Sequence, residues 1–273
     1  MSAGPIKDLG RVFDSVADAY DAGRPAYPDE MYRALSELSG VDLDGATTVD
    51  VGAGTGILTR ALRARGAQVI AVDPGAEMLA RLVSRADGED AGAGGREKSR
   101  ADERLDPPPV AAVLADGNAL PLADGVADLV TYAQSWHWLD PVVSIAEARR
   151  VLRPDGAIVG CWNLNHAAQA DWLAAYEARL AEAVPTYWGP AVEEWSVPPI
   201  ASAFEVIEER WIPWTRLVGI EDFLLGLRSH SYMAAMSPQT ADELVERQRV
   251  ELRKAFPEGV LSVPMRVYLA VGR

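Results

Sequence analysis

Aspartates and a glycine-rich turn recur at regular intervals in the first half of the 273-residue chain. Residues 50–56 read Asp-Val-Gly-Ala-Gly-Thr-Gly. Asp73 ends the next apolar segment, and Asp116 directly follows the one after it. Glycines let a backbone approach a ligand closely and adopt positive φ. A helix beginning near Ile57 points its free amide N–H groups toward that ligand. The pattern predicts a site for a nucleotide-like molecule.

The spacing of the glycines separates two kinds of ligand. A GxGxxG dinucleotide fingerprint that starts at Gly52 requires glycine at position 57, which is Ile57. Asp50 precedes the turn, and a pyrophosphate does not need a carboxylate beside it, whereas a ligand with an amino group and a sulfonium cation does. Asp73 is placed to accept both hydroxyls of a ribose, or alternatively to cap the helix after Pro74.

Apolar segments of strand length alternate with helical segments around these residues. This pattern predicts an α/β fold: a doubly wound, Rossmann-like, mostly parallel seven-stranded sheet with helices on both faces and a helical cap from the C-terminal half. The predicted strands are 47–51, 68–73, 110–115, 127–133, 157–162, 204–217 and 260–271. The predicted helices are 57–65, 76–84, 141–152, 171–184, 221–227 and 238–255, with a turn at 154–156.

One segment interrupts the alternation. Residues 85–109 mix glycine, charges and three consecutive prolines with a single large apolar residue, Leu105. Such a composition predicts a flexible surface insertion. We therefore expect a ligand-binding core over residues 1–163, and over residues 164–273 cap helices with the last strands of the same domain.

Composition narrows the classes of partner. The net charge of −14 argues against a nucleic-acid substrate, which requires a basic face. The start has no signal-like pattern, no apolar run is long enough to cross a membrane, and the single Cys161 forms no internal disulfide. The three histidines have no metal-binding spacing. We expect a cytoplasmic monomer or homodimer with no metal.

Several motifs in order give a family resemblance over residues 10–163. The chain resembles the class I S-adenosylmethionine-dependent methyltransferases, through residues 50–56, 72–74, 77–79, 115–122, 128–130 and 147–156. Residues 13–28 and the Ser-Trp-His-Trp segment 135–138 look more narrowly like the small-molecule branch called methyltransferase type 11, which includes trans-aconitate methyltransferase-like enzymes. The resemblance implies S-adenosylmethionine as cofactor.

The resemblance also implies roles for individual residues. Gly52, Ala53 and Gly54 would contact the methionine part of the cofactor, with Asp50 close by. The other implied cofactor residues are Asp73 at the ribose, Met78 on the adenine, Asp116 with Gly117 and Asn118 at the adenine amino group, Gln134 beside the sulfonium, and Tyr20 and Arg24 from an N-terminal helix. The alternatives are plain packing for Met78 and Tyr20, a turn role for Asp116 and a surface charge for Arg24.

The methyl acceptor is less well defined by the sequence. His137 follows the fourth strand and would act as a general base for a phenol or alcohol, or the Trp-His-Trp segment only packs under the cap. A carboxylate acceptor is already ionised and needs a cationic anchor instead, for which Arg216, Arg228 and Arg266 are candidates. Aromatic residues concentrate in the later half, as core or as an acceptor pocket: Trp162, Trp172, Tyr176, Tyr187, Trp188, Trp195, Trp211, Trp214 and Tyr232.

The sequence therefore predicts a methyltransferase enzyme that acts on a small-molecule acceptor, with O-methylation of a carboxylate or hydroxyl favoured. An NAD-dependent oxidoreductase is one alternative, against which Ile57 and the Asp116 segment argue. A cofactor-binding module without catalysis is the other.

Overall fold

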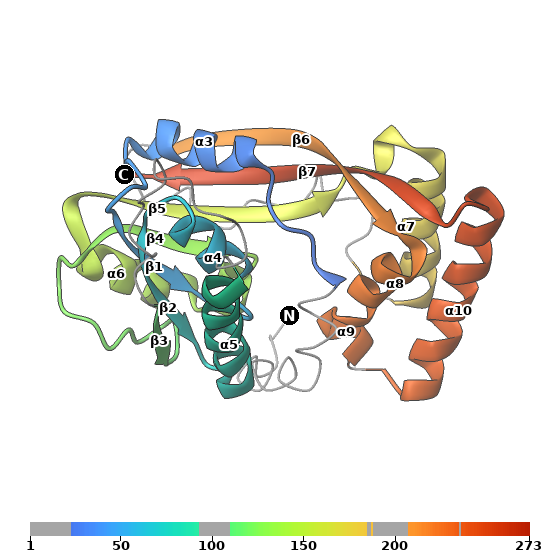
Figure 1. Cartoon of the computed structure of the whole chain (residues 1–273), viewed down its shortest axis with the longest axis horizontal. Helices are drawn as coiled ribbons and strands as arrows, with labels where there is room; N and C mark the ends of the chain where they lie inside the picture. The colour runs from blue at the N-terminus through green and yellow to red at the C-terminus, as the bar shows by residue number, and fades with distance from the viewer. Residues whose placement is uncertain (1–22, 93–109, 185–186, 188–206, 235) are drawn as a thin grey trace. The chain divides into compact units, whose positions relative to one another are not determined.

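The computed structural model describes residues 23–92, 110–184, 187, 207–234 and 236–273. Seven strands form one sheet in the order β3-β2-β1-β4-β5-β7-β6 (Figure 1). The strands are β1 (Thr47–Val51), β2 (Gln68–Asp73), β3 (Ala111–Leu114), β4 (Ala127–Ala133), β5 (Leu152–Asn165), β6 (Ile207–Gly219) and β7 (Val260–Gly272). The predicted seven-stranded, mostly parallel α/β fold is confirmed.

Helices connect most of these strands. They are α3 (Asp29–Ser39), α4 (Ile57–Arg63), α5 (Ala76–Gly92), α6 (Pro141–Val151), α7 (Asp171–Ala183), α8 (Ile220–Arg228), α9 (Ser231–Ala234) and α10 (Pro238–Ala255). Two short 3₁₀ helices, η3 (Trp136–Trp138) and η4 (Ala167–Gln169), follow β4 and β5. The helix α3 was not among the predicted elements. Most ends of the predicted helices and strands differ from the observed ends by only a few residues.

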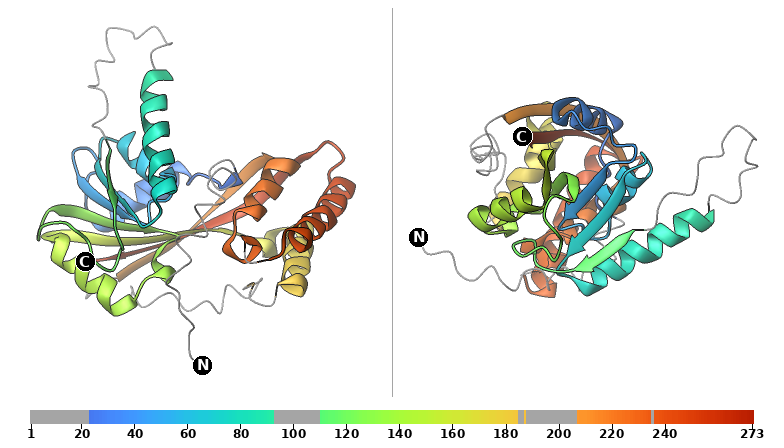
Figure 2. Two further views of the ribbon diagram at one scale, coloured as in Figure 1. Left: turned by 90° about the horizontal axis from the view of Figure 1, so that it is seen from below. Right: turned by 90° about the vertical axis from the view of Figure 1, so that its left-hand side faces the viewer.

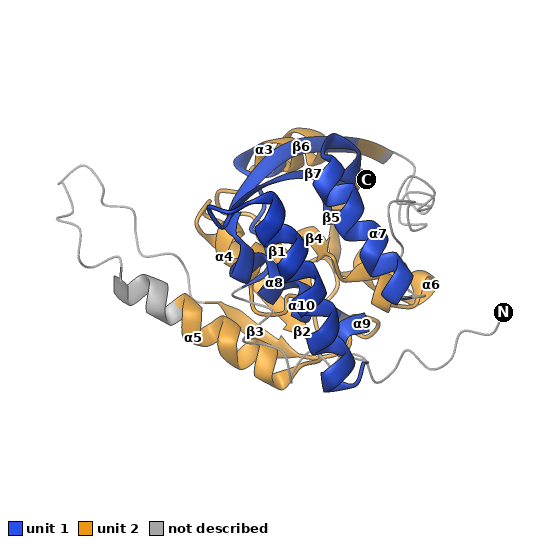
Figure 3. Ribbon diagram, turned by 90° about the vertical axis from the view of Figure 1, so that its right-hand side faces the viewer, with its two compact units in different colours: residues 1–31, 162–197, 210–269 blue, residues 32–161, 198–209, 270–273 orange. Residues whose placement is uncertain are grey.

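The chain divides into two compact units, coloured separately in Figure 3. Unit 2 contains residues 32–161, 198–209 and 270–273, and unit 1 contains residues 1–31, 162–197 and 210–269. The predicted boundary near residue 163 lies close to one of these divisions. The last residues of the chain, however, belong to unit 2, because β7 ends there.

Unit 2 holds the parallel part of the sheet. In it β1 pairs with β2 and β4, β2 with β3, and β4 with β5, all in parallel. The helices α4 and α5 lie on one side of these strands and α6 on the other (Figure 2). Both faces of β1, β2 and β4 are covered, so most of their residues are buried, including the polar Thr48, Asp50 and Thr131. This arrangement brings the carboxyl ends of these five parallel strands to one edge.

The helix α5 corrects the prediction for the start of the insertion. Residues 85–92 were expected to begin a flexible loop, but α5 continues through them to Gly92. Met78, Leu82 and Ala86 follow one another at four-residue steps and are all buried. This buried stripe stabilises the helix past Ser84. No proline interrupts it there, because the first proline of the segment is at position 107. The remaining residues of the predicted insertion, 93–109, lie outside the described residues.

The turn predicted at residues 154–156 is also wrong, because β5 runs through it. Ala127 pairs with Leu152 and Leu129 pairs with Ala157, so a five-residue step on β5 faces a two-residue step on β4. The Pro-Asp-Gly segment is thus accommodated as an irregularity within one strand. A Cβ at Gly156 would lie 2.8 Å from a methyl carbon of Leu152 and 3.1 Å from two backbone oxygens, so the strand is crowded at this position.

Unit 1 has a hydrophobic core of its own. Residues of α7, α8, α10 and β7 bury their apolar side chains together, among them Leu173, Leu224, Val245 and Val263. Tyr176 belongs to this core, and the predicted cap aromatics Trp172, Tyr187, Trp214 and Tyr232 pack against it while only partly buried. Trp188 and Trp195 lie outside the described residues. None of the helices in the described ranges is long and apolar enough to cross a membrane.

Candidate functional site

The glycine turn begins where β1 ends. Gly52, Gly54 and Gly56 all have positive φ, at +72°, +56° and +88°. The amides of Gly52 and Ala53 both donate to the carbonyl of Val72, at 2.8 and 3.1 Å, so the turn folds over the end of β2. This backbone path is the reason for the glycines, because side chains rarely adopt positive φ without strain.

Gly52 is also enclosed by its neighbours. An added Cβ would lie 2.3 Å from the Cβ of Ser135, which follows β4. The hydroxyl of Ser135 donates to the carbonyl of Val51 at 2.5 Å and holds the two strand ends together. The glycine at position 52 therefore lets the ends of β1 and β4 approach closely.

Asp73 connects two turns through its carboxylate. The Gly54 amide donates to Oδ2 and the Gly75 amide donates to Oδ1, both at 2.8 Å. The second bond fits the alternative that Asp73 caps the start of α5. A carboxylate oxygen has two acceptor positions, so these bonds do not prevent the carboxylate from also accepting ligand hydroxyls. Asp73 thus fixes the glycine turn and keeps acceptor capacity at the same edge.

Asp50 lies beneath the turn and is completely buried. The hydroxyl of Thr59 on α4 donates to Oδ2 at 2.6 Å, and that of Thr131 on β4 donates to Oδ1 at 3.0 Å. Burial raises the pKa of the Asp50 carboxyl to about 6, although these two hydrogen bonds oppose the increase and nearby Asp73 adds to it. Asp50 therefore links α4 to β4, a role that its position before the glycines did not indicate.

The segment after β3 forms a second turn around Asp116. The backbone amide and the side-chain amide of Asn118 both donate to Asp116 Oδ1 at 2.9 Å. The Asn118 carbonyl oxygen accepts from the Asp140 amide at 2.9 Å, which connects this turn to the start of α6. Gly117 packs so tightly on Val51 that a Cβ would lie 2.6 Å from it. The predicted adenine residues therefore lie beside the end of β1.

Gln134, just past β4, is the non-glycine residue with positive φ among the described ones, at +54°. Its amide donates to the Cys161 carbonyl at 2.9 Å. Such backbone strain persists only where the surroundings enforce it, and it gathers at functional positions. His137 follows in η3, half-buried, with its ring 4.6 Å from that of Trp138. This packing is compatible with both of its predicted roles.

The remaining predicted cofactor residues have different surroundings. Met78 is buried in the unit 2 core, in line with the packing alternative, and its adenine contact stays a prediction. Arg24 belongs to unit 1, where its Nε donates to Ser229 Oγ at 2.9 Å and its Nη2 lies 3.3 Å from His230 Nδ1. Its contact with the cofactor carboxylate also remains a prediction. Tyr20 lies outside the described residues.

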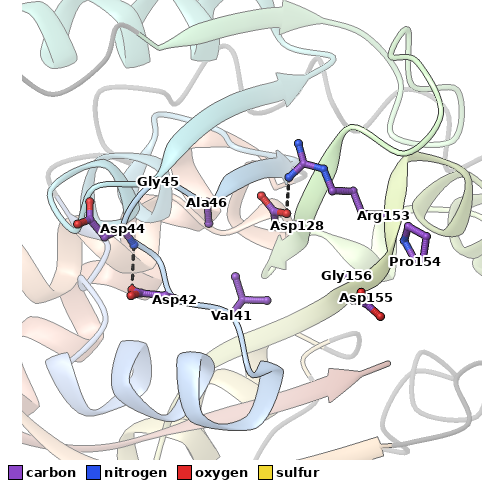
Figure 4. A pocket seen from close by; sticks show the side chains of 10 residues that line it. All are labelled: Val41, Asp42, Asp44, Gly45, Ala46, Asp128, Arg153, Pro154, Asp155 and Gly156. Atoms are coloured by element: carbon purple, nitrogen blue, oxygen red, sulfur yellow. Dashed lines mark hydrogen bonds and ion pairs between the residues drawn. The ribbon is translucent and has the colours of Figure 1, made fainter.

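A separate hollow lies at the opposite edge of the parallel strands, near the amino ends of β1 and β4 (Figure 4). It encloses about 480 Å³, and Asp44, Ala46, Asp128 and Arg153 are among the lining residues. Asp128 accepts from the Thr47 amide at 2.8 Å and pairs with Arg153. Burial alone would raise the pKa of Asp128, but the Arg153 and Thr47 hydrogen bonds lower it. These contacts join strand ends, far from the glycine turn.

The described residues include no group of three or more histidine, cysteine, aspartate or glutamate side chains that could hold a metal ion. The edge at the carboxyl ends of β1 and β2 instead offers a glycine backbone, the Asp73 carboxylate and the Asp116 turn. Ligands of open α/β sheets bind at this edge. The donor and acceptor set therefore fits a nucleoside with a charged amino-acid tail.

Comparison with known proteins identifies the class. Residues 49–160 match the family of methyltransferase domains. An uncharacterized methyltransferase of Mycobacterium tuberculosis is 30% identical over 243 residues, covering 89% of this chain and 86% of the relative. A structure described as a type II methyltransferase from Anaeromyxobacter dehalogenans has the same fold, with a TM-score of 0.65 at 23% identity over 92% of this chain and 97% of the other.

A further relative carries a more specific name. The malonyl-[acyl-carrier protein] O-methyltransferase of Geobacter sulfurreducens is 37% identical over 153 residues, which cover 55% of this chain and 51% of that protein.

These matches decide the family. The chain belongs to the class I S-adenosylmethionine-dependent methyltransferases. S-adenosylmethionine is therefore its cofactor, and the NAD-dependent alternative is not supported. The narrower trans-aconitate methyltransferase-like branch stays a prediction, as do the individual site residues.

Proposed function

We propose that this enzyme transfers a methyl group from S-adenosylmethionine to an oxygen atom of a small-molecule acceptor, a carboxylate or a hydroxyl. The main support is the glycine turn held by Asp73, which fits the cofactor at the carboxyl ends of β1 and β2. The relative named malonyl-[acyl-carrier protein] O-methyltransferase supports the choice of oxygen, because its name specifies methylation at a carboxylate-bearing acyl group.

When bound, S-adenosylmethionine supplies an activated methyl group that passes to the acceptor oxygen as the S–CH₃ bond breaks with its electron pair left on sulfur. The protein then contributes mainly alignment and a water-poor environment. Gly52, Ala53 and Gly54 would hold the methionine part through their backbone, and Asp73 the ribose hydroxyls. Gln134 would position its side chain near the sulfonium from a strained backbone.

The requirement for a base depends on the acceptor. A carboxylate attacks without losing a proton, whereas a hydroxyl must lose one. His137 is the base that the sequence predicts, and its half-buried ring leaves it accessible to proton exchange. Substitution of His137 by alanine should therefore separate the two acceptor classes.

The direct test is a screen for S-adenosylhomocysteine release with carboxylic acids, phenols, alcohols and amines. We expect acids or hydroxyl compounds to be turned over. For an acid acceptor, H137A should retain kcat within about twofold, and for a phenol it should lose roughly 100-fold. A matched control is H166A, a histidine outside the predicted site. Turnover of amines alone would contradict O-methylation.

A further inference from the structure

Arg150, in the last turn of α6, binds the segment of unit 2 that joins β3 to β4. Its Nη2 donates to the Leu120 carbonyl at 2.9 Å. Its Nη1 donates to the Leu122 carbonyl at 2.7 Å and to Asp124 Oδ1 at 2.8 Å. Residues 115–126 form neither helix nor strand, so their backbone groups need partners of another kind. A single guanidinium supplies several of them.

Glu147, three residues earlier on the same helix, orients this guanidinium. Arg150 Nε donates to Oε1 at 2.9 Å and Nη2 donates to Oε2 at 2.8 Å, so the pair is bidentate. Oε2 also accepts from the Leu120 amide at 2.8 Å. The hydrogen bonds from Arg150, aided by that from Leu120, lower the pKa of Glu147, although burial opposes them. The amide and the carbonyl of Leu120 are thus both bound by charged side chains of α6.

The ion pair by itself contributes little to stability. The side chains of Arg150 and Glu147 are 31% and 21% exposed. Ion pairs with this much contact with solvent add little to the free energy of unfolding, because water screens their attraction. The main consequence of the pair is therefore the fixed position of the backbone at Leu120.

Leu120 follows the Asp116 turn almost directly. The Ala119 amide donates to the Asp116 carbonyl at 2.9 Å and closes the turn, and Leu120 itself is buried. On the other side of the turn, the Ala115 amide donates to the Asp73 carbonyl at 3.2 Å. The turn is therefore fixed between the end of β2 and the backbone that α6 holds.

Packing on the inner side limits the turn further. A Cβ at Gly117 would lie 2.6 Å from a side-chain carbon of Val51 and 3.1 Å from two methyl carbons of Leu139, so the turn cannot move toward them. Displacement in the opposite direction is resisted by the contacts at Leu120. A carboxylate that shifts by about 1 Å leaves the range of a normal hydrogen bond. The position of the Asp116 carboxylate thus depends on the contacts of Leu120.

We propose that Arg150, oriented by Glu147, is a positioning residue for the base of the cofactor. By fixing the backbone at Leu120 it keeps the Asp116 carboxylate where it accepts from the adenine amino group. It thereby makes the enzyme select adenine over a base that carries an oxygen at that place. This role rests on the predicted contact between Asp116 and adenine, and it does not depend on which acceptor atom is methylated.

The test compares two ligands that differ at this position of the base. S-adenosylhomocysteine carries the adenine amino group, whereas S-inosylhomocysteine carries an oxygen there, which a carboxylate repels. Calorimetric titration measures the binding of both to the full chain. We expect wild type to bind S-adenosylhomocysteine at least tenfold more tightly, on the order of 1.4 kcal/mol. R150Q should lose roughly tenfold for S-adenosylhomocysteine and little for S-inosylhomocysteine, so that the preference nearly disappears.

R153Q is the matched control, because Arg153 pairs with Asp128 at the opposite edge of the parallel strands. It should leave both affinities unchanged. A purely structural role of Arg150 would lower the melting temperature without changing the preference between the two ligands. If R150Q does not fold, R150K and E147Q become the deciding variants, since each removes the bidentate pair of a guanidinium with a carboxylate. Each should reduce the preference about threefold.

A double-mutant cycle with D116A shows whether Arg150 acts through the turn. D116A should abolish the preference, and R150Q/D116A should bind S-adenosylhomocysteine within about twofold of D116A alone. Additive losses in the double variant would overturn the role of Arg150. So would an unchanged preference in the deciding variants, or equal affinity of wild type for the two ligands.

Discussion

Asp50, in the glycine motif, has a carboxylate whose pKa is changed by burial in the fold. Its carboxylate lies between the hydroxyls of Thr59 and Thr131. Asp50 is also the first residue of the glycine motif. The two threonines occupy both oxygens, so the residue is placed to set the geometry of the turn. In the sequence the acid was associated with a ligand carrying an amino group, and the threonine contacts were not anticipated.

The raised pKa of Asp50 predicts a pH dependence of stability. Its folded pKa of about 6 exceeds the unfolded value, so the folded state binds the proton more tightly. The associated stabilisation is complete near pH 4 and is lost as pH rises through 6. D50N should therefore show a weaker decline of the free energy of unfolding over this window, by on the order of 3 kcal/mol.

Urea unfolding at pH 4, 5, 6 and 7 measures this difference directly. D155N, at an exposed aspartate in β5, is the control and should follow the wild-type slope. Parallel pH profiles for wild type and D50N would show that burial of this carboxyl has no such consequence.

At the scale of elements, α6 connects the predicted adenine turn to the sheet. Asp140 is its N-cap, and its side chain accepts from the amides of Val142 and Val143, at 2.9 and 3.0 Å. The Asp140 amide in turn donates to Asn118. The cap therefore holds both the helix and the turn after β3.

D140A should remove this cap at a cost of about 1 kcal/mol in the free energy of unfolding. Because the Asn118 contact is then less well fixed, we also expect S-adenosylhomocysteine to bind about threefold more weakly. S237A removes the comparable cap of α10, where Ser237 accepts from the Thr240 amide at 3.2 Å, and should lower stability alone. Equal cofactor affinity in wild type, D140A and S237A would contradict the coupling of cap and turn.

The elements also show what sequence periodicity can and cannot decide. The strands β1, β2 and β4 were predicted at their observed bounds, because β-branched and apolar residues dominate these short segments. The end of α5 was missed because the glycine and charges in residues 85–92 resemble a loop, although Ala86 continues the buried stripe of Met78 and Leu82. The Pro-Asp-Gly signal in β5 was misleading because register with β4 is a tertiary property.

The same limit applies to the site. Gly52, Gly54 and Asp73 were recognisable because a tight turn and a strand-end acid leave local signals. Ser135 and Thr131 left none, since their partners are 84 and 81 residues away in the chain. The hydrogen bond between Trp214 and Asn163 left no signal either, since the two residues are 51 positions apart.

In the whole molecule, most of the predicted cofactor residues and the aromatic residues of the later half belong to different compact units. The glycine turn, Asp73 and the Asp116 turn belong to unit 2, which matches the methyltransferase domain family over residues 49–160. The aromatic residues of the later half that the structure describes belong to unit 1. The expectation that unit 1 selects the acceptor agrees with this division and remains a proposal.

The most direct test of the central claim is calorimetric titration of wild type, D73N and G52A with S-adenosylhomocysteine and with NADH. We predict that wild type binds S-adenosylhomocysteine and not NADH. D73N should bind about tenfold more weakly, because the amide replaces an acceptor oxygen at the ribose edge and disturbs the Gly54 contact. G52A should bind more weakly still, since its Cβ would meet Ser135. Binding of NADH without S-adenosylhomocysteine, or unchanged affinity in both variants, would contradict the assignment of the glycine turn as the cofactor site.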